Sequence, residues 1–131
     1  MVLVDTNIWI DYFGGVKSPH TDWLDQAVGK VQLGLTDLNL CELLQGVRDD
    51  AQFVWLRREM RRFDVFDTGG EALAIAAAEN YRFLRKQGYT VRKTIDSFIA
   101  TYCLREGHAL LHHDRDFDPF ERLLGLQVIH P

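Results

Sequence analysis

The chain has 131 residues, of which 47% are hydrophobic and 26% are charged, values close to the average of a single globular domain and unlike those of a disordered tail or a fibre. Its longest apolar run, at 72–78, has seven residues, whereas a membrane-spanning helix needs roughly 20. The N-terminus has no basic segment ahead of an apolar stretch and carries Asp5, which excludes a secretory signal. We therefore expect a protein of the cytoplasm with no membrane segment.

The cysteine content and the net charge indicate the redox state of the thiols and argue against one class of nucleic-acid-binding protein. Cys41 and Cys103 lack the Cys-x-x-Cys spacing, so we expect reduced, partly buried thiols. The net charge of -4 argues against a surface that coats nucleic acid in general. A local basic groove remains compatible with this charge.

Strands and helices are predicted to alternate along the first half of the chain. Short runs rich in Val and Leu are typical of buried strands, and Gly after a helical pattern marks a helix end. In order, the sequence predicts a strand at 1–4, a helix from about 7 to Gly14, a helix at 21–28, a strand at 31–35 and a helix from Thr36 or Asp37 to Gly46.

The second half continues this alternation. A helix capped by Asp49 or Asp50 is predicted to turn Phe53, Leu56, Met60 and Phe63 inward, with arginines on its outer face. The other predicted elements are a short strand or crossing loop at 64–66, a helix from about 71 to 87, a helix from a Thr94 cap to Gly107, a strand at 109–111, a helical turn at 119–124 and a last strand at 127–129.

Strands separated by helices require crossover connections, which favour a mostly parallel sheet with both faces covered. The sequence therefore predicts an α/β fold, a three-layer sandwich with a small, mostly parallel central sheet flanked by helices. We expect residues 1–131 to form a single domain.

Four carboxylates map to one edge of this sheet. In a parallel α/β sheet, the carboxyl ends of strands and the N-termini of helices share the edge where ligands usually bind. The acids at this edge are Asp5 after the first strand, Glu42 in the second turn of its helix, Asp96 in the first turn of its helix, and Asp114 after the strand at 109–111, with Asp116 and Asp118 close behind.

Carboxylates gathered in one cleft repel one another unless a cation offsets their charge. Oxygen ligands without a converging Cys or His favour Mg²⁺ or Mn²⁺ over Zn²⁺. Such a metal suits phosphodiester hydrolysis, because it activates water and polarises a phosphoryl oxygen. Thr6 or Asn7, beside Asp5, is placed to hydrogen-bond a metal ligand or a water.

Each acid alone also has an ordinary structural explanation. Asp96 suits a helix N-terminus, Asp5 a helix cap, and the aspartates from 114 onward a turn. Glu42 is harder to explain in this way, because its surroundings are apolar and an unpaired buried carboxylate is costly. A shared site requires all four acids to reach one edge.

Four segments, Val-Asp-Thr-Asn at 4–7, Cys-Glu-Leu-Leu-Gln-Gly at 41–46, Thr-Ile-Asp-Ser-Phe-Ile-Ala at 94–100 and Asp-Arg-Asp-Phe at 114–117, together resemble the PIN-domain family and, within it, the VapC-type toxins of bacterial toxin–antitoxin pairs. The resemblance covers essentially the whole chain. It implies a Mg²⁺- or Mn²⁺-dependent endoribonuclease that is homodimeric and is silenced by a small cognate antitoxin inserted into the active-site groove.

The resemblance also implies roles for the acids. Asp5 and Asp96 match the surest metal ligands, Glu42 and Asp114 complete the catalytic quartet, and Asp116 is an auxiliary carboxylate. One position departs from the pattern, because Thr or Ser commonly stands where this chain has His112. The local hydrogen bonding and the division of labour between Asp114 and Asp116 therefore stay open.

His112 and His113 allow several interpretations. A second metal site or a general base is one, but adjacent histidines on an extended chain point in different directions. Phosphate contact or simple loop polarity is the more ordinary explanation.

Basic residues are concentrated despite the net negative charge. We expect Arg48, Arg92 and Lys93 to contact RNA, although solvated helix faces explain such residues equally well. These three residues belong to two larger basic groups, one of Arg48, Arg57, Arg58, Arg61 and Arg62 and the other of Arg82, Arg85, Lys86, Arg92 and Lys93. The aromatic residues Trp9, Tyr12 and Phe13 favour a core or dimer interface over base stacking.

Two other functions remain as alternatives. A phosphatase of the haloacid-dehalogenase type also has Asp after its first strand, but it uses a second Asp two residues later, where this chain has Asn7. A catalytically weak or inactive PIN-like module that binds RNA would require the acids to be dispensable.

Overall fold

The computed structural model describes residues 1–131 and contains one sheet and seven α-helices. The strands are β1 (Val2–Val4), β2 (Leu33–Thr36), β3 (Asp64–Phe66) and β4 (Ala109–Leu111). The helices are α1 (Thr6–Phe13), α2 (Pro19–Ala27), α3 (Asp37–Gln45), α4 (Asp50–Glu59), α5 (Glu71–Lys86), α6 (Thr94–Glu106) and α7 (Asp118–Leu124). The strand order is β3-β2-β1-β4, and every neighbouring pair is parallel.

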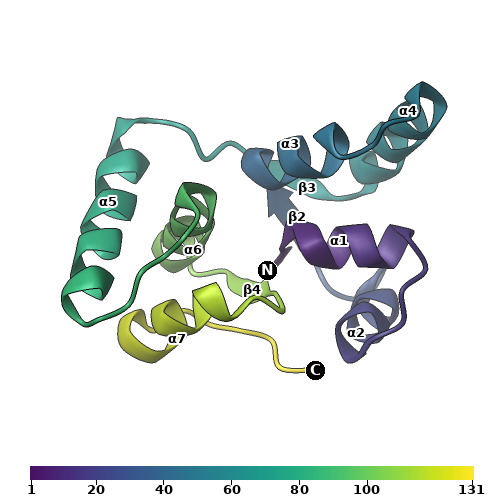
Figure 1. Ribbon diagram of the computed structural model, residues 1–131. Helices are drawn as coiled ribbons and strands as arrows, with labels where there is room; N and C mark the ends of the chain where they lie inside the picture. The colour runs from purple at the N-terminus through teal and green to yellow at the C-terminus, as the bar shows by residue number, and fades with distance from the viewer.

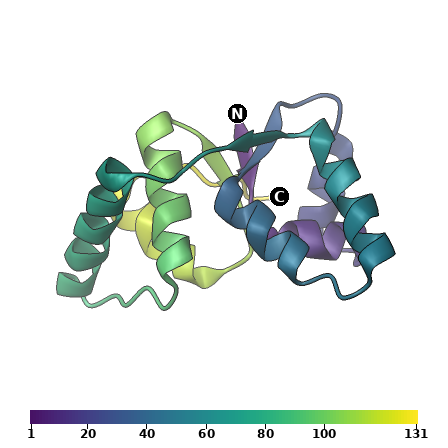
Figure 2. The same ribbon diagram turned by 90° about the horizontal axis from the view of Figure 1, so that it is seen from above.

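Helices cover both faces of this sheet. Figures 1 and 2 show α1–α4 on one side and α5–α7 on the other. The side chains of β1 alternate between the two faces of the sheet. Val2 and Val4 pack with α1–α4, whereas Leu3 packs with α5–α7. The predicted three-layer α/β sandwich is confirmed.

Large aromatic side chains fill each core. Trp9 of α1 is fully buried, and its ring centroid lies 6.0 Å from that of Phe13 and 4.7 Å from that of Phe63. On the other side of the sheet, Phe117 and Phe120 are fully buried. Trp9 is therefore a core residue and does not offer a stacking surface to a base.

Two helix starts differ from the sequence-based prediction. Helix α2 begins at Pro19 rather than at residue 21, because Ser18 and Thr21 form a reciprocal capping box. Helix α6 begins at Thr94 itself, with Lys93 at the N-cap position and no side-chain cap, so the prediction that Thr94 caps this helix was wrong.

Two further predictions were wrong in detail. The segment around Val128 makes only an isolated parallel bridge to Leu110 and is not a strand. Leu56 of α4 and Met60, in the 3₁₀ turn that follows this helix, are buried as predicted, but Phe53 remains 36% exposed. The segment at 64–66, left open between strand and loop, is the edge strand β3.

Both cysteines are free, but they differ in burial, since Cys41 is exposed and Cys103 is buried. None of the helices is both long enough and apolar enough to cross a bilayer.

Candidate active site

The ends of β1 and β4, the N-termini of α1 and α6, and the C-terminal half of α3 meet around a pocket of about 150 Å³. The four carboxylates predicted from the sequence all line it. The full lining is Asp5, Thr6, Asn7, Ile10, Glu42, Gln45, Lys93, Asp96 and Asp114. Topology thus brings residues from four separate segments to one place.

Asp5 enters this pocket from the end of β1. Its backbone N–H donates to the carbonyl of Leu111 at 3.0 Å, which ties it to the end of β4. It occupies the N-cap position of α1, yet its side chain makes no capping hydrogen bond. The carboxylate, 5% exposed, is therefore directed to the pocket rather than used as a helix cap.

A chain of hydrogen bonds joins Asp5 to Glu42. The Asn39 amide Nδ2 donates to Asp5 Oδ1 at 3.3 Å and to Thr6 Oγ1 at 3.0 Å. The Thr6 hydroxyl in turn donates to Glu42 Oε1 at 2.9 Å. Thr6 therefore bonds one of the candidate carboxylates, whereas Asn7 lines the pocket and is exposed.

Asn39 was missed by the sequence analysis. It is fully buried in α3 and forms a capping box with Thr36, a residue predicted only to begin this helix. A polar residue between the apolar Leu38 and Leu40 was the one available signal. Its partners in α1 lie more than 30 residues away in sequence, so no local pattern points to them.

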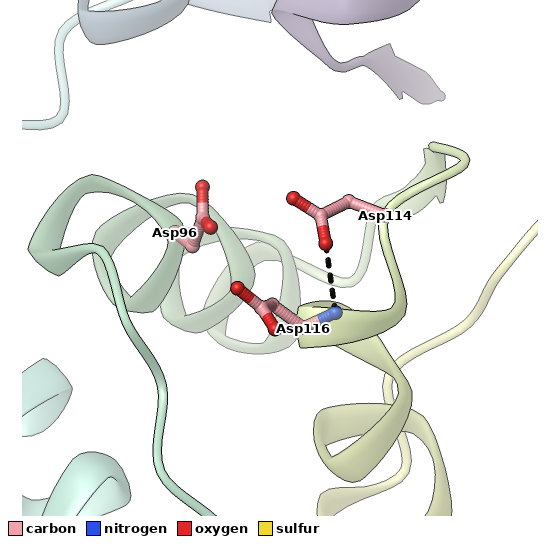
Figure 3. Close-up of side chains that lie close together, drawn as sticks. All are labelled: Asp96, Asp114 and Asp116. Carbon is pink, nitrogen blue, oxygen red and sulfur yellow. Dashed lines mark hydrogen bonds between the residues drawn. The ribbon is translucent and has the colours of Figure 1, made fainter.

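Three aspartates form the opposite side of the site (Figure 3). One carboxylate oxygen from each of Asp96, Asp114 and Asp116 lies within 4.8 Å of the other two. Asp114 Oδ1 accepts the backbone N–H of Asp116 at 2.9 Å. The Arg92 guanidinium donates from Nε to Asp116 Oδ2 at 3.1 Å and from Nη2 to Asp116 Oδ1 at 3.2 Å. Neither Arg92 nor Asp116 lines the pocket.

Asp96 lies in the first turn of α6 but is only 6% exposed. Its Oδ2 atom is buried and has no hydrogen-bond partner. A carboxylate that served only the helix dipole would be solvated at the surface. A buried, unpartnered oxygen instead requires a proton or a cation.

The crowding of acids shifts their protonation. Burial, together with the charges of Glu42 and Asp114, raises the pKa of Asp5 to about 6. Burial and the charges of Asp5 and Asp114 raise the pKa of Asp96 to about 7, against the opposing influence of Lys93. The donor set consists of carboxylate oxygens alone and is short of positive charge, which fits a hard divalent cation.

His112, which stands where the family commonly has Thr or Ser, accepts a hydrogen bond from the backbone of Asp114. Its Nδ1 accepts the backbone N–H of Asp114 at 3.1 Å, and its ring packs 4.8 Å from that of Phe117. Burial lowers the pKa of His112, which favours the neutral ring that this bond requires. His112 therefore fixes the backbone of a site carboxylate.

His113 points elsewhere. It pairs with Asp11 at 3.4 Å and lies edge-on to His20, with ring centroids 5.8 Å apart. The residues able to hold a metal jointly are the three aspartates, with no histidine among them. His112 and His113 therefore contact different partners.

The three basic residues predicted to contact RNA lie in different parts of the structure. Lys93 lines the acidic pocket, and Arg92 pairs with Asp116. Arg48 lies instead in an apolar groove of about 740 Å³ between α1, α3 and α4, beside Phe13 and Trp55. Only Lys93 therefore lines the acidic pocket directly.

The family model for the PIN domain matches residues 2–123. The chain belongs to the PIN-domain family. It is 30% identical over 130 residues to Ribonuclease VapC11 of Mycobacterium tuberculosis and to VapC ribonuclease Mb1587 of Mycobacterium bovis, covering 98% of this chain and 97% of each relative. The predicted family is confirmed.

Several solved structures have the same fold as this chain. VapBC2 from Rickettsia felis, bound to a promoter DNA fragment, superposes with a TM-score of 0.78 at 18% identity, covering 98% of both chains. FitAcB from Neisseria gonorrhoeae has a TM-score of 0.78 at 17% identity, covering 100% of this chain and 98% of its own. At this identity the likeness shows the fold and nothing finer.

Proposed function

We propose that residues 1–131 form a single-domain, metal-dependent endoribonuclease of the VapC type, the toxin of a toxin–antitoxin pair. The observation that carries the proposal is the convergence of Asp96, Asp114 and Asp116, whose oxygens lie within 4.8 Å of one another. Curated relatives at 30% identity over nearly the whole chain are named ribonucleases, which supports the same reaction.

Mg²⁺ or Mn²⁺ is the proposed cation, held by Asp96 and Asp114 together with Asp5 and Glu42. When bound, such an ion activates a water and stabilises charge on the phosphoryl oxygens. Asp116 is the auxiliary carboxylate, restrained by Arg92. Thr6 orients Glu42, and Lys93 at the rim attracts the phosphate backbone of RNA.

A small antitoxin is the proposed protein partner, and we propose that the chain is a homodimer. Several structural neighbours are VapBC complexes, such as VapBC-1 of nontypeable Haemophilus influenzae. The apolar groove between α1, α3 and α4 shares Ile10 with the acidic pocket. An apolar antitoxin segment in this groove would reach the carboxylates.

Cleavage of a labelled single-stranded RNA, followed with Mg²⁺ and with EDTA, tests the proposal. We expect cleavage by the wild type that EDTA abolishes, and loss of cleavage in Asp96→Asn. Asp22→Asn is the matched control, since Asp22 is an exposed acid in the first turn of α2 that does not line the pocket.

The other outcomes point to the alternatives. RNA binding without cleavage by any variant would favour an RNA-binding module. Hydrolysis of a phosphomonoester without RNA cleavage would favour a phosphatase. Cleavage by Asp96→Asn equal to that of the wild type would refute the site.

A further inference from the structure

We infer that Asn39 is a positioning residue that fixes the direction of the hydrogen bonds at Asp5, Thr6 and Glu42. Asn39 is 0% exposed and lies beneath the pocket rather than in its lining. It therefore acts through its neighbours and does not touch the reacting atoms. The inference rests on the proposed function, because it concerns the same site.

The orientation of the Asn39 amide is set by the main chain. The backbone N–H of Thr36 donates to Asn39 Oδ1 at 3.2 Å, and the Thr36 hydroxyl donates to the same atom at 2.8 Å. A backbone N–H can only donate, so the atom facing it must be the amide oxygen. The amide NH₂ is consequently directed at Asp5 and Thr6.

The orientation of the Asn39 amide also determines which hydrogen bond Thr6 makes to Glu42. Because Thr6 Oγ1 accepts from Asn39, the single hydroxyl hydrogen of Thr6 is available for Glu42 Oε1 at 2.9 Å. Two carboxylates thus receive hydrogen bonds that originate at the N-terminus of α3. Carboxylates that ligate a metal are themselves commonly held by such hydrogen bonds, which fix their orientation.

An aspartate at this position would have nearly the same shape but the opposite effect. The carboxylate introduced by Asn39→Asp has no hydrogen to give to Asp5 Oδ1, 3.3 Å away, and would place a second charge there. The Thr6 hydroxyl would then turn its hydrogen toward the new carboxylate and away from Glu42. Asn39→Leu removes the donors without adding charge.

The test measures Mn²⁺ affinity by calorimetry, and kcat and KM on a labelled single-stranded RNA. We expect Asn39→Asp and Asn39→Leu to lower Mn²⁺ affinity or kcat by about 10- to 100-fold, with KM for RNA unchanged. Thr6→Val should reproduce part of the loss. Combining it with Asn39→Leu should cost less than the sum of the two single effects, because both break one chain.

Asn80→Leu is the matched control. The Asn80 amide donates to the Thr101 hydroxyl at 3.0 Å, so it is also an Asn–Thr pair between two elements, but it lies between α5 and α6. We expect this variant to lower Tm without changing Mn²⁺ affinity or kcat. Asn39 variants that lower Tm and leave both quantities within twofold of the wild type would overturn the inference.

Failure of the proposed function would look different. If the wild type binds Mn²⁺ but does not cleave RNA, reduced Mn²⁺ affinity in the Asn39 variants still supports the positioning role. If Asn39→Leu does not fold, Thr6→Val gives the same readouts, and unchanged Mn²⁺ affinity and kcat in that variant would overturn the inference.

Discussion

The two sides of the candidate site, which include residues just outside the pocket lining, are built in contrasting ways. On the bonded wall, formed by Asp5, Thr6, Asn39 and Glu42, the polar atoms are joined in one hydrogen-bonded chain. On the open wall, formed by Asp96, Asp114 and Asp116, a buried oxygen of Asp96 has no partner. The bonded wall is complete as folded, whereas the open wall lacks positive charge.

The contrast shows where a cation contributes most. On the bonded wall the Asn39 amide donates to Asp5 and Thr6, and the Thr6 hydroxyl donates to Glu42, so the geometry of this wall does not depend on a ligand. The open wall has one strong cationic partner, Arg92, which is 65% exposed and holds only Asp116. A divalent cation is the group that would offset the charges left at Asp96 and Asp114.

The largest expected effect comes from removing charge at the open wall without disturbing its backbone. Asp114→Asn keeps an oxygen that can accept the Asp116 N–H, so the turn should remain intact. We expect RNA cleavage to fall by more than about 100-fold, since even outer-shell changes at metal sites cost about 10- to 100-fold. Comparison of cleavage rates and Tm with Asp22→Asn checks this, and a loss of cleavage explained by unfolding would count against it.

His112 offers a smaller and sharper perturbation. In His112→Asn the amide oxygen can take the place of Nδ1 and accept the Asp114 N–H, whereas His112→Leu cannot. We expect cleavage within about threefold of the wild type for the Asn variant and a loss of about 10- to 100-fold for the Leu variant. Equal activity of the two variants would show that the hydrogen bond is unimportant.

The pH dependence of stability should report the raised pKa of Asp96 on the open wall. The pKa of Asp96 is raised to about 7, so the folded protein binds a proton that the unfolded chain releases near pH 4. Stability from this group is therefore full below about pH 4 and is lost as the pH rises to about 7. We expect metal-free wild type to lose stability relative to Asp96→Asn across this range.

Tm measured in EDTA between pH 5 and pH 8 tests this difference, which we expect to be on the order of 5 °C. Taking the difference between the two proteins removes the opposing contribution of His112, whose lowered pKa destabilises the fold at acid pH. Saturating Mn²⁺ should raise the wild-type Tm at pH 7.5 and leave that of Asp96→Asn nearly unchanged. A pH-independent difference in EDTA would contradict the raised pKa.

The smallest expected effect is at Arg92. Its pair with Asp116 is solvated on the arginine side, and such exposed pairs contribute little to stability. Arg92→Gln should therefore leave Tm within about 3 °C and change cleavage by no more than a few-fold. A loss as large as that of Asp114→Asn would move Asp116 from an auxiliary to a principal role.

The sequence predicted the architecture and the acids well, because both follow from local patterns and topology. Alternating strands and helices require a parallel sheet, and this sheet brings Asp5 and Asp96 to one edge although 91 positions separate them. The confirmed elements are those with a clear period or cap, such as α3 behind Thr36.

What the sequence did not predict depends on contacts made only after folding. The bonds of Asn39 to Asp5 and Thr6 cross more than 30 residues and leave no periodic trace. Phe53 follows the helical period but remains partly exposed, because α4 lies at the periphery of its layer (Figure 1). The segment at 127–129 is apolar enough for a strand, yet it forms a bridge with Leu110 alone.

Titration of Mn²⁺ into the metal-free protein, followed by calorimetry, tests most directly whether the open wall holds the cation. Wild type, Asp96→Asn and Asp22→Asn should be measured side by side. We predict saturable binding by the wild type and by Asp22→Asn, with affinity reduced by more than about 100-fold in Asp96→Asn. Equal affinity in all three, or no binding by the wild type at millimolar Mn²⁺, would contradict a metal site at these carboxylates.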